Sequence, residues 1–271
     1  MIKNENDLKG QFFVGKTDSL IKSIMERRVG DVWTDNLDTP TMIFASDGSY
    51  GYFDGIVTDD FIQECIEQII RDTGRITIIP HGKYIQKAIG SYLRNRSIKD
   101  GIIIESKEYN VSTNKRFLME PANGMLDKFR LGYYLSLLPK NMSMVAIDAS
   151  LFKKIKIDKE VDFLLEQYES YEVLSSIGQG YVILDGDIIV AGAVPYSKFS
   201  NGIEVEYMTR EAYRGNGYAT IVAARLLTYC LENNLEAVWD AAHLASVSVA
   251  EKLGYTLAKE YEAYTIKDKG L

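Results

Sequence analysis

The feature that most constrains this fold is residues 203–255, where strand-like and helix-like apolar patterns alternate around a turn that contains Gly215 and Gly217. Residues 203–209 are typical of a strand, and residues 237–240 of a second one. Between them, apolar residues recur at the spacing of a buried helical face: Val222, Leu226, Leu227, Cys230 and Leu231. This order predicts that the chemistry of the protein lies at the turn, where the helix begins.

The turn at residues 214–217 has the composition of an anion site. Gly215 and Gly217 permit left-handed backbone and let a ligand approach bare main chain. The N–H groups that open a helix lack intrahelical partners, and the helix dipole is positive at that end. Arg210 and Arg214 add positive charge to an otherwise acidic chain. A ligand that carries a diphosphate is therefore expected there.

Two other interpretations of the turn compete with this one. A helix can begin at a glycine for packing alone. A dinucleotide-binding fold would use Asp240, at the end of the second strand, to bind a ribose. In that motif, however, Thr220 would replace the third glycine, and Glu204 and Glu206 stand in a strand that should be apolar. The dinucleotide interpretation is therefore disfavoured.

The pattern Arg214-x-x-Gly217-x-Ala219 resembles the (Q/R)xxGx(G/A) acyl-CoA signature of the GNAT acetyltransferases. The last helix ends in the run KLGY at residues 252–255, which is similar to the KxGF-type turn of that family. The surrounding sequence is similar to the branch that contains the zwittermicin A resistance proteins. The resemblance covers about the last 130 residues well and the first 140 loosely. It implies a GNAT fold with a central mixed, splayed sheet flanked by helices.

We expect a mixed α+β protein with an amino-terminal α/β domain over residues 1–140 and a GNAT domain over residues 141–271. In the first domain, periodicity predicts helices over 17–28, 59–72 and 83–94, strands over 41–46, 49–53, 76–79 and 101–105, and a polar loop over 109–116. In the second, it predicts a strand over 144–147, a helix over 158–169, a flexible connection over 175–180, and a hairpin of 181–184 with 188–191. The first domain is interpreted as a degenerate GNAT-like repeat that shapes the acceptor side, or as a stabilising or dimerising cap.

Composition excludes several classes of function. The net charge of −7 and the pI near 5.1 leave no basic patch for nucleic acid. No apolar run has the length of a signal peptide or a membrane span, so a cytoplasmic protein is expected. Cys65 and Cys230 lie in helix-like segments and are expected to be buried, reduced residues. With only His81 and His243 besides, no zinc site is expected.

The resemblance implies an N-acetyltransferase that uses acetyl-CoA and a primary amine of a small molecule, with direct attack in a ternary complex. In the family, pantetheine lies in a gap between two parallel strands. By motif position the gap-lining strand is residues 204–209, with the backbones of Tyr207 and Thr209 facing pantetheine and one N–H serving as oxyanion donor. The residues expected to bind acetyl-CoA are Tyr207, Met208, Thr209, Arg214, Gly215, Asn216, Gly217, Tyr218, Ala219, Thr220, His243 and Ser246.

An amine acceptor must lose a proton, and two carboxylates are candidates for the general base. Glu206 lies nearer the expected gap and is the first choice, and Asp240 is the second. A carboxylate that is partly desolvated there could have a raised pKa. Alternatively, these acids bind backbone groups freed where the sheet opens, or attract a cationic substrate.

Two departures from the wider family concern the general acid. Many relatives have a tyrosine, the general acid for the departing thiolate, where this chain has Ala250. Here either the thiolate leaves without an acid, or Tyr207, Ser246 or Tyr255 takes the place of that tyrosine. His243 stands where an asparagine commonly contacts CoA, and it could bind, act as the acid, or only cap a helix. A catalytically silent acyl-CoA-binding protein, a sensor or scaffold, therefore remains the alternative. A homodimer is a further expectation.

Overall fold

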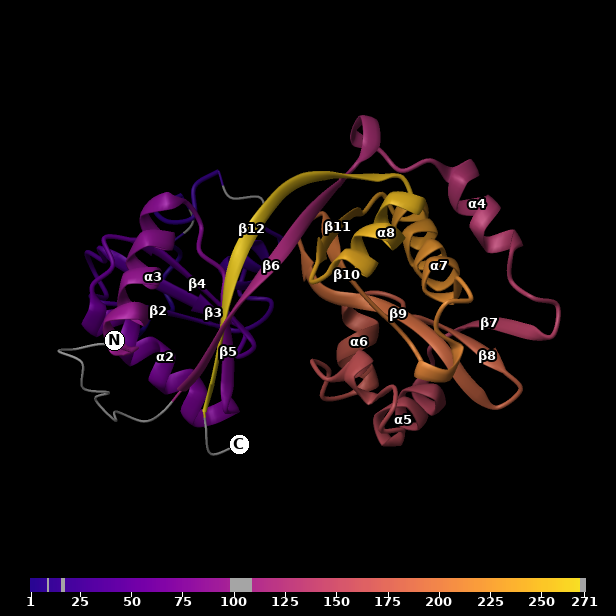
Figure 1. The fold of residues 1–271 in the computed structure, drawn as a ribbon, viewed down its shortest axis with the longest axis horizontal. Coiled ribbons are helices and arrows are strands. Elements are labelled where there is room, and N and C mark those ends of the chain that lie inside the picture. Colours follow the sequence, from indigo (N-terminus) through magenta and orange to yellow (C-terminus); the bar gives the residue numbers. More distant parts are fainter. Residues whose placement is uncertain (9, 16–17, 98–108, 269–271) are drawn as a thin grey trace. The chain divides into compact units, whose positions relative to one another are not determined.

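The structure, a computed structural model, describes residues 1–8, 10–15, 18–97 and 109–268. Contacts divide the chain into two compact units (Figure 1): unit 1 is Met1–Arg116 with Tyr261–Leu271, and unit 2 is Phe117–Glu260. The division differs from the expected boundary between residues 140 and 141. Two long strands, β6 and β12, cause this difference, because each contributes residues to both units.

Unit 1 is a mixed sheet with helices. Its strands follow the order β1, β2, β3, β4, β5 and then the end of β12; β4 and β5 are parallel, and the other pairs are antiparallel. The elements are β1 (Ile2–Lys3), α1 (Ser19–Met25), β2 (Asp31–Thr34), β3 (Met42–Ser46), β4 (Tyr50–Gly55), α2 (Asp59–Thr73), β5 (Arg75–Ile78) and α3 (Lys83–Ser97).

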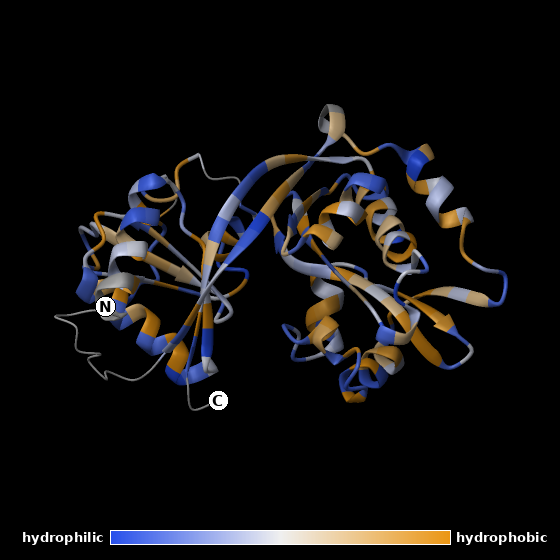
Figure 2. Cartoon of the chain, in the orientation of Figure 1, coloured by the Kyte–Doolittle hydropathy of each residue, from blue (hydrophilic) through white to orange (hydrophobic). Residues whose placement is uncertain are grey.

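Local sequence explains the best-predicted parts of unit 1. The side chain of Asp47 accepts hydrogen bonds from the N–H groups of Ser49 and Tyr50, which closes the β3–β4 hairpin. Thr58 caps the start of α2, and Gly74, at φ 76°, ends it in the left-handed conformation. Hydrophobic and hydrophilic residues alternate along α2 (Figure 2), and its apolar face is buried.

Unit 2 has a second mixed sheet, in the order β6, β11, β10, β9, β8 and β7. Only β10 and β11 pair in parallel among its described strand pairs. The elements are β6 (Tyr109–Pro121), η1 (Ala122–Gly124), α4 (Lys128–Ser136), β7 (Met142–Ala146), α5 (Ala149–Ile157), η2 (Asp162–Leu165), α6 (Tyr171–Ile177), β8 (Tyr181–Asp185), β9 (Ile188–Phe199), β10 (Gly202–Thr209), η3 (Glu211–Tyr213), α7 (Tyr218–Glu232), β11 (Glu236–Ala241), α8 (Leu244–Lys252) and β12 (Tyr255–Asp268).

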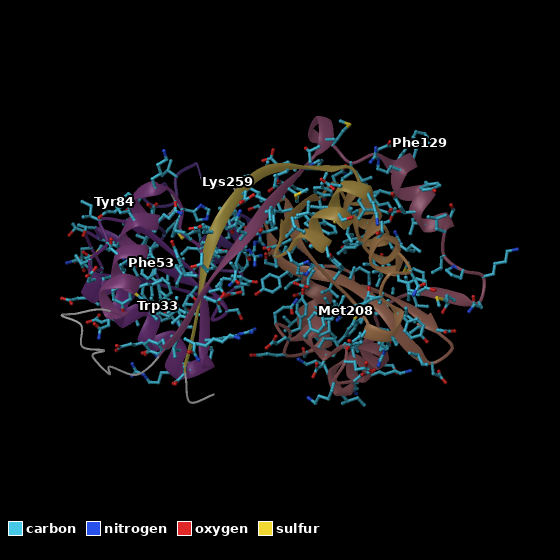
Figure 3. All side chains as sticks on the ribbon, in the orientation of Figure 1. Trp33, Phe53, Tyr84, Phe129, Met208 and Lys259 are labelled. Atoms are coloured by element: carbon cyan, nitrogen blue, oxygen red, sulfur yellow. The ribbon has the colours of Figure 1, made fainter. Side chains whose placement is uncertain are left out.

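Apolar side chains cover both faces of the sheet of unit 2. On one face, α7 and α8 pack over a core that includes Leu226, Trp239 and Tyr255. On the other, α5, η2 and α6 pack over a core that includes Phe152 and Met208. Met208 is labelled in Figure 3. Along β10, Glu204, Glu206 and Tyr207 are only partly buried although the sheet is covered on both faces.

The order of elements is the same in the two halves of the chain. In each half a first strand and helical segment lead to a three-stranded antiparallel meander, then to a helix, a parallel strand, a helix and a long last strand. The last strand of each half completes the sheet of the other unit, since β12 pairs with β5 and the end of β6 pairs with β11. The segment β4–α2–β5 thus corresponds to β10–α7–β11.

Three predicted segments differ from the structure. Residues 109–116, expected as a polar loop, form the start of β6, whose exposed polar side chains give no apolar period. The helix expected over 158–169 is a turn with η2, although Val161, Leu164, Leu165 and Tyr168 are all buried as expected. The connection expected over 175–180 begins inside α6. The strand expected over 101–105 lies outside the described residues.

None of the described helices combines the length and apolar character needed to cross a membrane.

Candidate functional site

The strands β10 and β11 part halfway along their length. They pair in parallel from Gly202 with Glu236 to Glu204 with Val238. Beyond that point residues 239–241 of β11 pair with β6, and residues 205–209 of β10 pair with β9. In the described register, therefore, the edge of β10 over residues 205–209 has no strand beside it on the β11 side. This is the splayed sheet that the resemblance implied.

The backbone groups that face the gap follow from the alternation of the strand. The N–H of Arg210 donates to the carbonyl of Val190 on β9, at 2.8 Å. Because the direction alternates along a strand, the N–H groups of Tyr207 and Thr209 face away from β9, into the gap. The N–H of Tyr207 donates instead to Oε1 of Glu206, at 3.3 Å. The carbonyl of Thr209 accepts from Nε of Arg214, also at 3.3 Å.

Large aromatic rings lie under the point where the strands part. The ring centroids of Tyr207 and Trp239 are 5.3 Å apart, and those of Trp239 and Tyr255 are 5.6 Å apart. Nε1 of Trp239 donates to the hydroxyl of Ser246 at 3.1 Å. Burial raises the pKa of the Tyr207 phenol, and a hydrogen bond from Ser246 offsets this in part. Tyr207, Trp239 and Tyr255 thus form one aromatic cluster on a single face of the sheet, beside the gap.

Tyr255 has the geometry of a packing residue. It is 2% exposed, and its hydroxyl donates to the carbonyl of Ala237 at 2.8 Å. Burial raises the pKa of this phenol well above its ordinary value. Its hydroxyl is thus committed to the main chain of β11 inside the core, which does not suit the general-acid role expected from the sequence.

The glycine turn before α7 leaves the start of the helix open. Gly215 and Gly217 have φ of 82° and 83°, and Gly217 is the N-cap, where no side chain makes a capping hydrogen bond. A Cβ added at either glycine would meet nothing within 4 Å. The Asn216 amide donates to the carbonyls of Tyr213 and Arg214, at 3.1 and 3.3 Å, which holds the turn closed. The N–H groups of the first turn, Tyr218 to Thr220, are therefore presented to a ligand.

The charge of this turn comes from Arg214 and the helix dipole, not from Arg210 as expected. The guanidinium of Arg210 contacts the carboxylates of Asp158 and Glu160, and its Nε donates to the carbonyl of Ile189 at 2.8 Å. Arg210 thus ties β10 to the turn before η2. Arg214 is exposed, so its guanidinium can also reach a ligand at the turn.

Glu206 and Met208 share the face of β10 that is covered by η2 and α6. Met208 is buried in the core there, and by the same alternation its N–H and carbonyl face β9 and not the gap. Tyr168 lies close enough to Glu206 for an electrostatic interaction, and its hydroxyl donates to the carbonyl of Pro195. Burial, with a smaller effect of Glu206, raises the pKa of Tyr168. Glu206 is therefore a half-buried carboxylate at the edge of the gap.

Asp240 and His243 lie at the carboxyl end of β11. Asp240 is half-buried and pairs with Leu118 of β6. His243 is the N-cap of α8, where its Nδ1 accepts from the N–H of Ser246 at 3.1 Å. The cap occupies Nδ1 and leaves Nε2 as the nitrogen that can meet a ligand. The capping role, one of the alternatives weighed from the sequence, is thus present.

Sequence reasoning missed the structural roles of Trp239 and Tyr168. Trp239 links Tyr207, Tyr255 and Ser246 beneath the gap, although it reads only as an apolar strand residue. Tyr168 reads as one more inward-facing residue of a helix. No local signal distinguishes either, because their partners lie on other strands.

The residues present fit an acyl-CoA. The gap offers an unpaired strand edge, and the hydroxyl of Thr209 beside it is buried without a hydrogen-bond partner among the described residues. The turn offers an open cradle at the positive end of a 15-residue helix. A thiol-bearing arm along the strand and a diphosphate at the turn would satisfy both.

Comparison with known proteins agrees with this geometry. The family model described as GNAT acetyltransferase matches residues 10–264. The chain is 25% identical over 276 residues to the uncharacterized N-acetyltransferase YdfB of Bacillus subtilis (strain 168), covering 97% of this chain and 95% of the relative.

Solved structures agree as well. The chain is similar to the crystal structure of a GCN5-related N-acetyltransferase-like protein from Streptococcus suis 89/1591, with a TM-score of 0.78, 28% identity, and coverage of 94% and 95% of the two chains. A GCN5-related N-acetyltransferase from Kribbella flavida shares the fold at 12% identity, with a TM-score of 0.55 over 93% and 95% of the chains.

Proposed function

Because this chain belongs to the GNAT acetyltransferase family, we propose that it transfers the acetyl group of acetyl-CoA to a primary amine of a small molecule. Membership of the family makes the protein an acyltransferase. The observation that carries the finer proposal is the parting of β10 from β11 beside the open glycine turn of α7. Together they place an unpaired strand edge and an open helix N-terminus close together in the sequence.

In this proposal, acetyl-CoA supplies the acetyl group as a thioester. The N–H groups from Gly215 to Thr220, with Arg214, bind the diphosphate through the helix dipole and charge. The main chain of Tyr207 and Thr209 binds pantetheine as an added strand would. The N–H of Tyr207 donates to the thioester carbonyl oxygen, where negative charge develops. Side chains along this edge contribute less to the binding of acetyl-CoA than the backbone does.

Glu206 is proposed as the general base that takes the proton of the attacking amine. Its carboxylate already lies within hydrogen-bond distance of the Tyr207 N–H, so base and oxyanion donor are neighbours. Attack of the amine on the thioester needs no covalent enzyme intermediate, so a direct transfer in a ternary complex is sufficient. Asp240, on the facing strand, is the second candidate.

The acceptor is proposed to be cationic before it reacts. Glu204, Glu206 and Asp240 border the gap, and the chain carries a net charge of −7. Such a site favours an ammonium group over a neutral or acidic acceptor. The resemblance to the zwittermicin A resistance branch supports a small polyamine-like or amino-sugar-like compound. Acceptor pockets differ widely within one fold, so the resemblance narrows the class without naming the compound.

One alternative has specific support. Ala250 is fully buried in the position where many relatives carry the tyrosine acid, and Nδ1 of His243 is used to cap α8. A protein with both departures could bind acyl-CoA without turning it over. This sensor function shares the binding site and differs only in the chemistry.

Two measurements test the binding site and then separate the two functions. Calorimetry should detect binding of acetyl-CoA and none of NAD or ATP; the reverse result would contradict the assignment. Thiol release should then be followed with a panel of polyamines and amino sugars. Release with one or more amines supports the transferase, whereas binding without release across the panel supports the sensor.

A further inference from the structure

Trp239 connects the two strands that part at the gap. It is the first residue of β11 after the last pair with β10, which joins Glu204 and Val238. Its ring centroid lies 5.3 Å from that of Tyr207 on β10. Its Nε1 donates to the hydroxyl of Ser246, in the first turn of α8, at 3.1 Å. One buried side chain thus contacts both β10 and α8 beside the gap.

The chemistry of these groups sets the direction of their hydrogen bonds. An indole N–H only donates, so the oxygen of Ser246 is the acceptor and its own proton needs another acceptor. That acceptor is the phenol oxygen of Tyr207, because a hydrogen bond from Ser246 partly offsets the effect of burial, which raises the pKa of this phenol. The phenol proton of Tyr207 therefore points away from Ser246. Among the described residues, none accepts that proton in a hydrogen bond.

Tyr255, the other tyrosine against Trp239, has the opposite arrangement. Its ring centroid lies 5.6 Å from that of Trp239, but its hydroxyl donates to the carbonyl of Ala237 inside the core. Tyr255 is buried, whereas Tyr207 is partly exposed. Of the two phenols, only that of Tyr207 thus has a proton to offer to a ligand.

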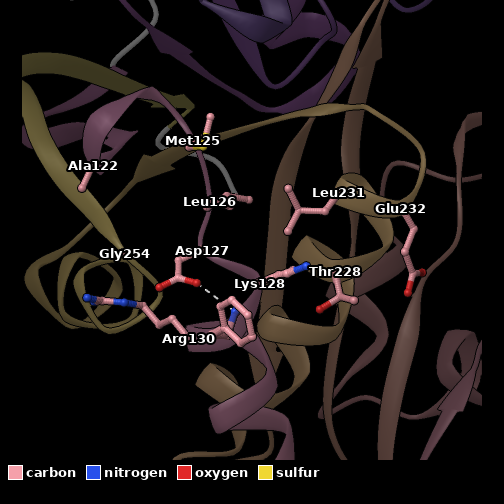
Figure 4. Close-up of a pocket in the computed structure, with 11 residues that line it drawn as sticks. Ala122, Met125, Leu126, Asp127, Lys128, Arg130, Thr228, Leu231, Glu232 and Gly254 are labelled. Atoms are coloured by element: carbon pink, nitrogen blue, oxygen red, sulfur yellow. Dashed lines mark hydrogen bonds between the residues drawn. The ribbon is translucent and has the colours of Figure 1, made fainter.

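The helix that carries Ser246 is held at both ends. At its start, Nδ1 of His243 accepts from the Ser246 N–H at 3.1 Å. At its end, Nη1 of Arg130 donates to the carbonyls of Glu251 and Lys252, at 3.4 and 3.5 Å. Arg130 belongs to α4 and also lines a groove between α4 and α7 (Figure 4). The hydroxyl of Ser246 is therefore in place before a ligand binds.

We propose that Tyr207 is the general acid of the reaction, and that Trp239 and Ser246 are positioning residues that turn its phenol proton toward the departing sulfur. These roles rest on the proposed transfer from acetyl-CoA. From the sequence, Tyr207, Ser246 and Tyr255 are equal candidates to supply this proton. The hydrogen bonds assign them separate roles: acid, positioning residue and packing residue.

The proton transfers of this mechanism balance. The amine nitrogen forms a bond to the thioester carbon, and its proton goes to the carboxylate of Glu206. The carbon–sulfur bond breaks with its electron pair on sulfur, and Tyr207 gives its phenol proton to that sulfur. The phenolate then takes up a proton from water, and Glu206 releases one to water. The charge of Glu206 disfavours the phenolate, so Tyr207 recovers its proton after each turnover.

Tyr207→Phe tests the acid. The substitution keeps the ring beside Trp239 and the main-chain N–H, so the affinity for acetyl-CoA should change little. With an amine that gives thiol release, kcat should fall by about 10²–10⁴. Tyr255→Phe is the matched control, because it removes the hydroxyl of the neighbouring ring and should leave kcat unchanged. A wild-type kcat in Tyr207→Phe, or an equal fall in both variants, would overturn the proposal.

A double-substitution cycle tests the positioning role. Ser246→Ala should lower kcat about tenfold, the effect of one hydrogen bond, and should have no further effect when Tyr207→Phe is already present. Ser246→Thr retains a hydroxyl and should recover most of the activity. A residue that acts only through the stability of α8 would lower kcat equally in both backgrounds. That result would contradict the positioning role.

Calorimetry with free CoA and with desulfo-CoA, which lacks the sulfur, tests the contact without turnover. Tyr207→Phe should weaken the binding of CoA about tenfold and leave that of desulfo-CoA unchanged. If the unchanged protein released no thiol with any amine, acetyl transfer would be wrong, but this difference would still support the contact between Tyr207 and the sulfur. An active protein in which Tyr207→Phe binds CoA as the unchanged protein does would retain the transfer and contradict the acid.

Discussion

The backbone N–H of Tyr207 donates a hydrogen bond to Oε1 of Glu206, the residue before it, over 3.3 Å. This N–H lies on the side of β10 from which β11 has parted. The carboxylate therefore occupies the position where we expect the carbonyl oxygen of an acyl donor. Binding of the donor would displace the carboxylate from this N–H and leave it beside the attacking amine.

Substitution of Glu206 should separate chemistry from binding. Glu206→Gln keeps the size of the side chain but cannot take a proton, so kcat should fall by about 10²–10⁴ and the rise of rate with pH should flatten. The affinity for acetyl-CoA should change little. Glu204→Gln is the control, because Glu204 lies on the same face but at the last paired position. A wild-type pH profile in Glu206→Gln would exclude Glu206 as the general base and favour Asp240.

The chain should bind one acetyl-CoA and not two, although its halves share an order of elements. In unit 1 the helix that corresponds to α7 is α2, whose N-terminus is capped by the side chain of Thr58. Asp59 and Asp60 follow in its first turn and would repel a diphosphate. Titration calorimetry should give a stoichiometry of one per chain. A second site of comparable affinity would contradict this difference between the halves.

The capping role of His243 predicts a stability effect that depends on the substitute. His243→Ala removes the side-chain acceptor of the Ser246 N–H, which also donates to the His243 carbonyl at 2.9 Å, and should lower the free energy of unfolding by up to about 1 kcal/mol. His243→Asn, which restores the common family residue and is itself a good cap, should retain stability. Urea unfolding of both variants measures this. Equal stability of the alanine and asparagine variants would show that the cap contributes nothing.

Buried thiols should make the protein less stable at alkaline pH. Burial raises the pKa of Cys230 from 9.0 to about 12. Between these values the unfolded chain binds fewer protons than the folded chain, so the free energy of unfolding falls as pH rises. Cys230→Ala should reduce this slope by up to about 1.4 kcal/mol per pH unit, although it also costs packing. Urea titrations at pH 8, 9 and 10 measure how the free energy of unfolding depends on pH. An unchanged dependence in the variant would contradict a raised pKa of Cys230.

Local chemistry made much of the fold predictable. The hairpins at Asp47-Gly48 and Asp185-Gly186 form where turn chemistry places them, and Gly74 ends α2 as expected. The helix after Gly217 and its buried face also match the predicted period. These features depend on residues close in sequence, whose conformational preferences act before any tertiary contact forms.

Long-range contacts explain what could not be predicted. The pairing of Arg210 with Asp158 and Glu160 joins residues about fifty positions apart, so the sequence alone suggested a ligand-binding arginine. The spacing of the buried residues from Val161 to Tyr168 satisfies a helix, but the chain forms turns there. The division by contacts falls elsewhere than the expected boundary because β6 and β12 each contribute residues to both units. The gap itself was expected only through family resemblance.

The central claim is that the open turn before α7 binds the diphosphate of acetyl-CoA, and calorimetry of Gly217→Asp tests it most directly. A side chain at this position meets nothing in the protein, and Asp, like Asn, adopts a positive φ more readily than most residues, so the fold should survive while the added carboxylate repels the ligand. Gly217→Asn, similar in size but uncharged and tolerant of a positive φ, is the matched control. We predict that Gly217→Asp abolishes binding of acetyl-CoA and that Gly217→Asn weakens it less; wild-type affinity in Gly217→Asp would contradict the account.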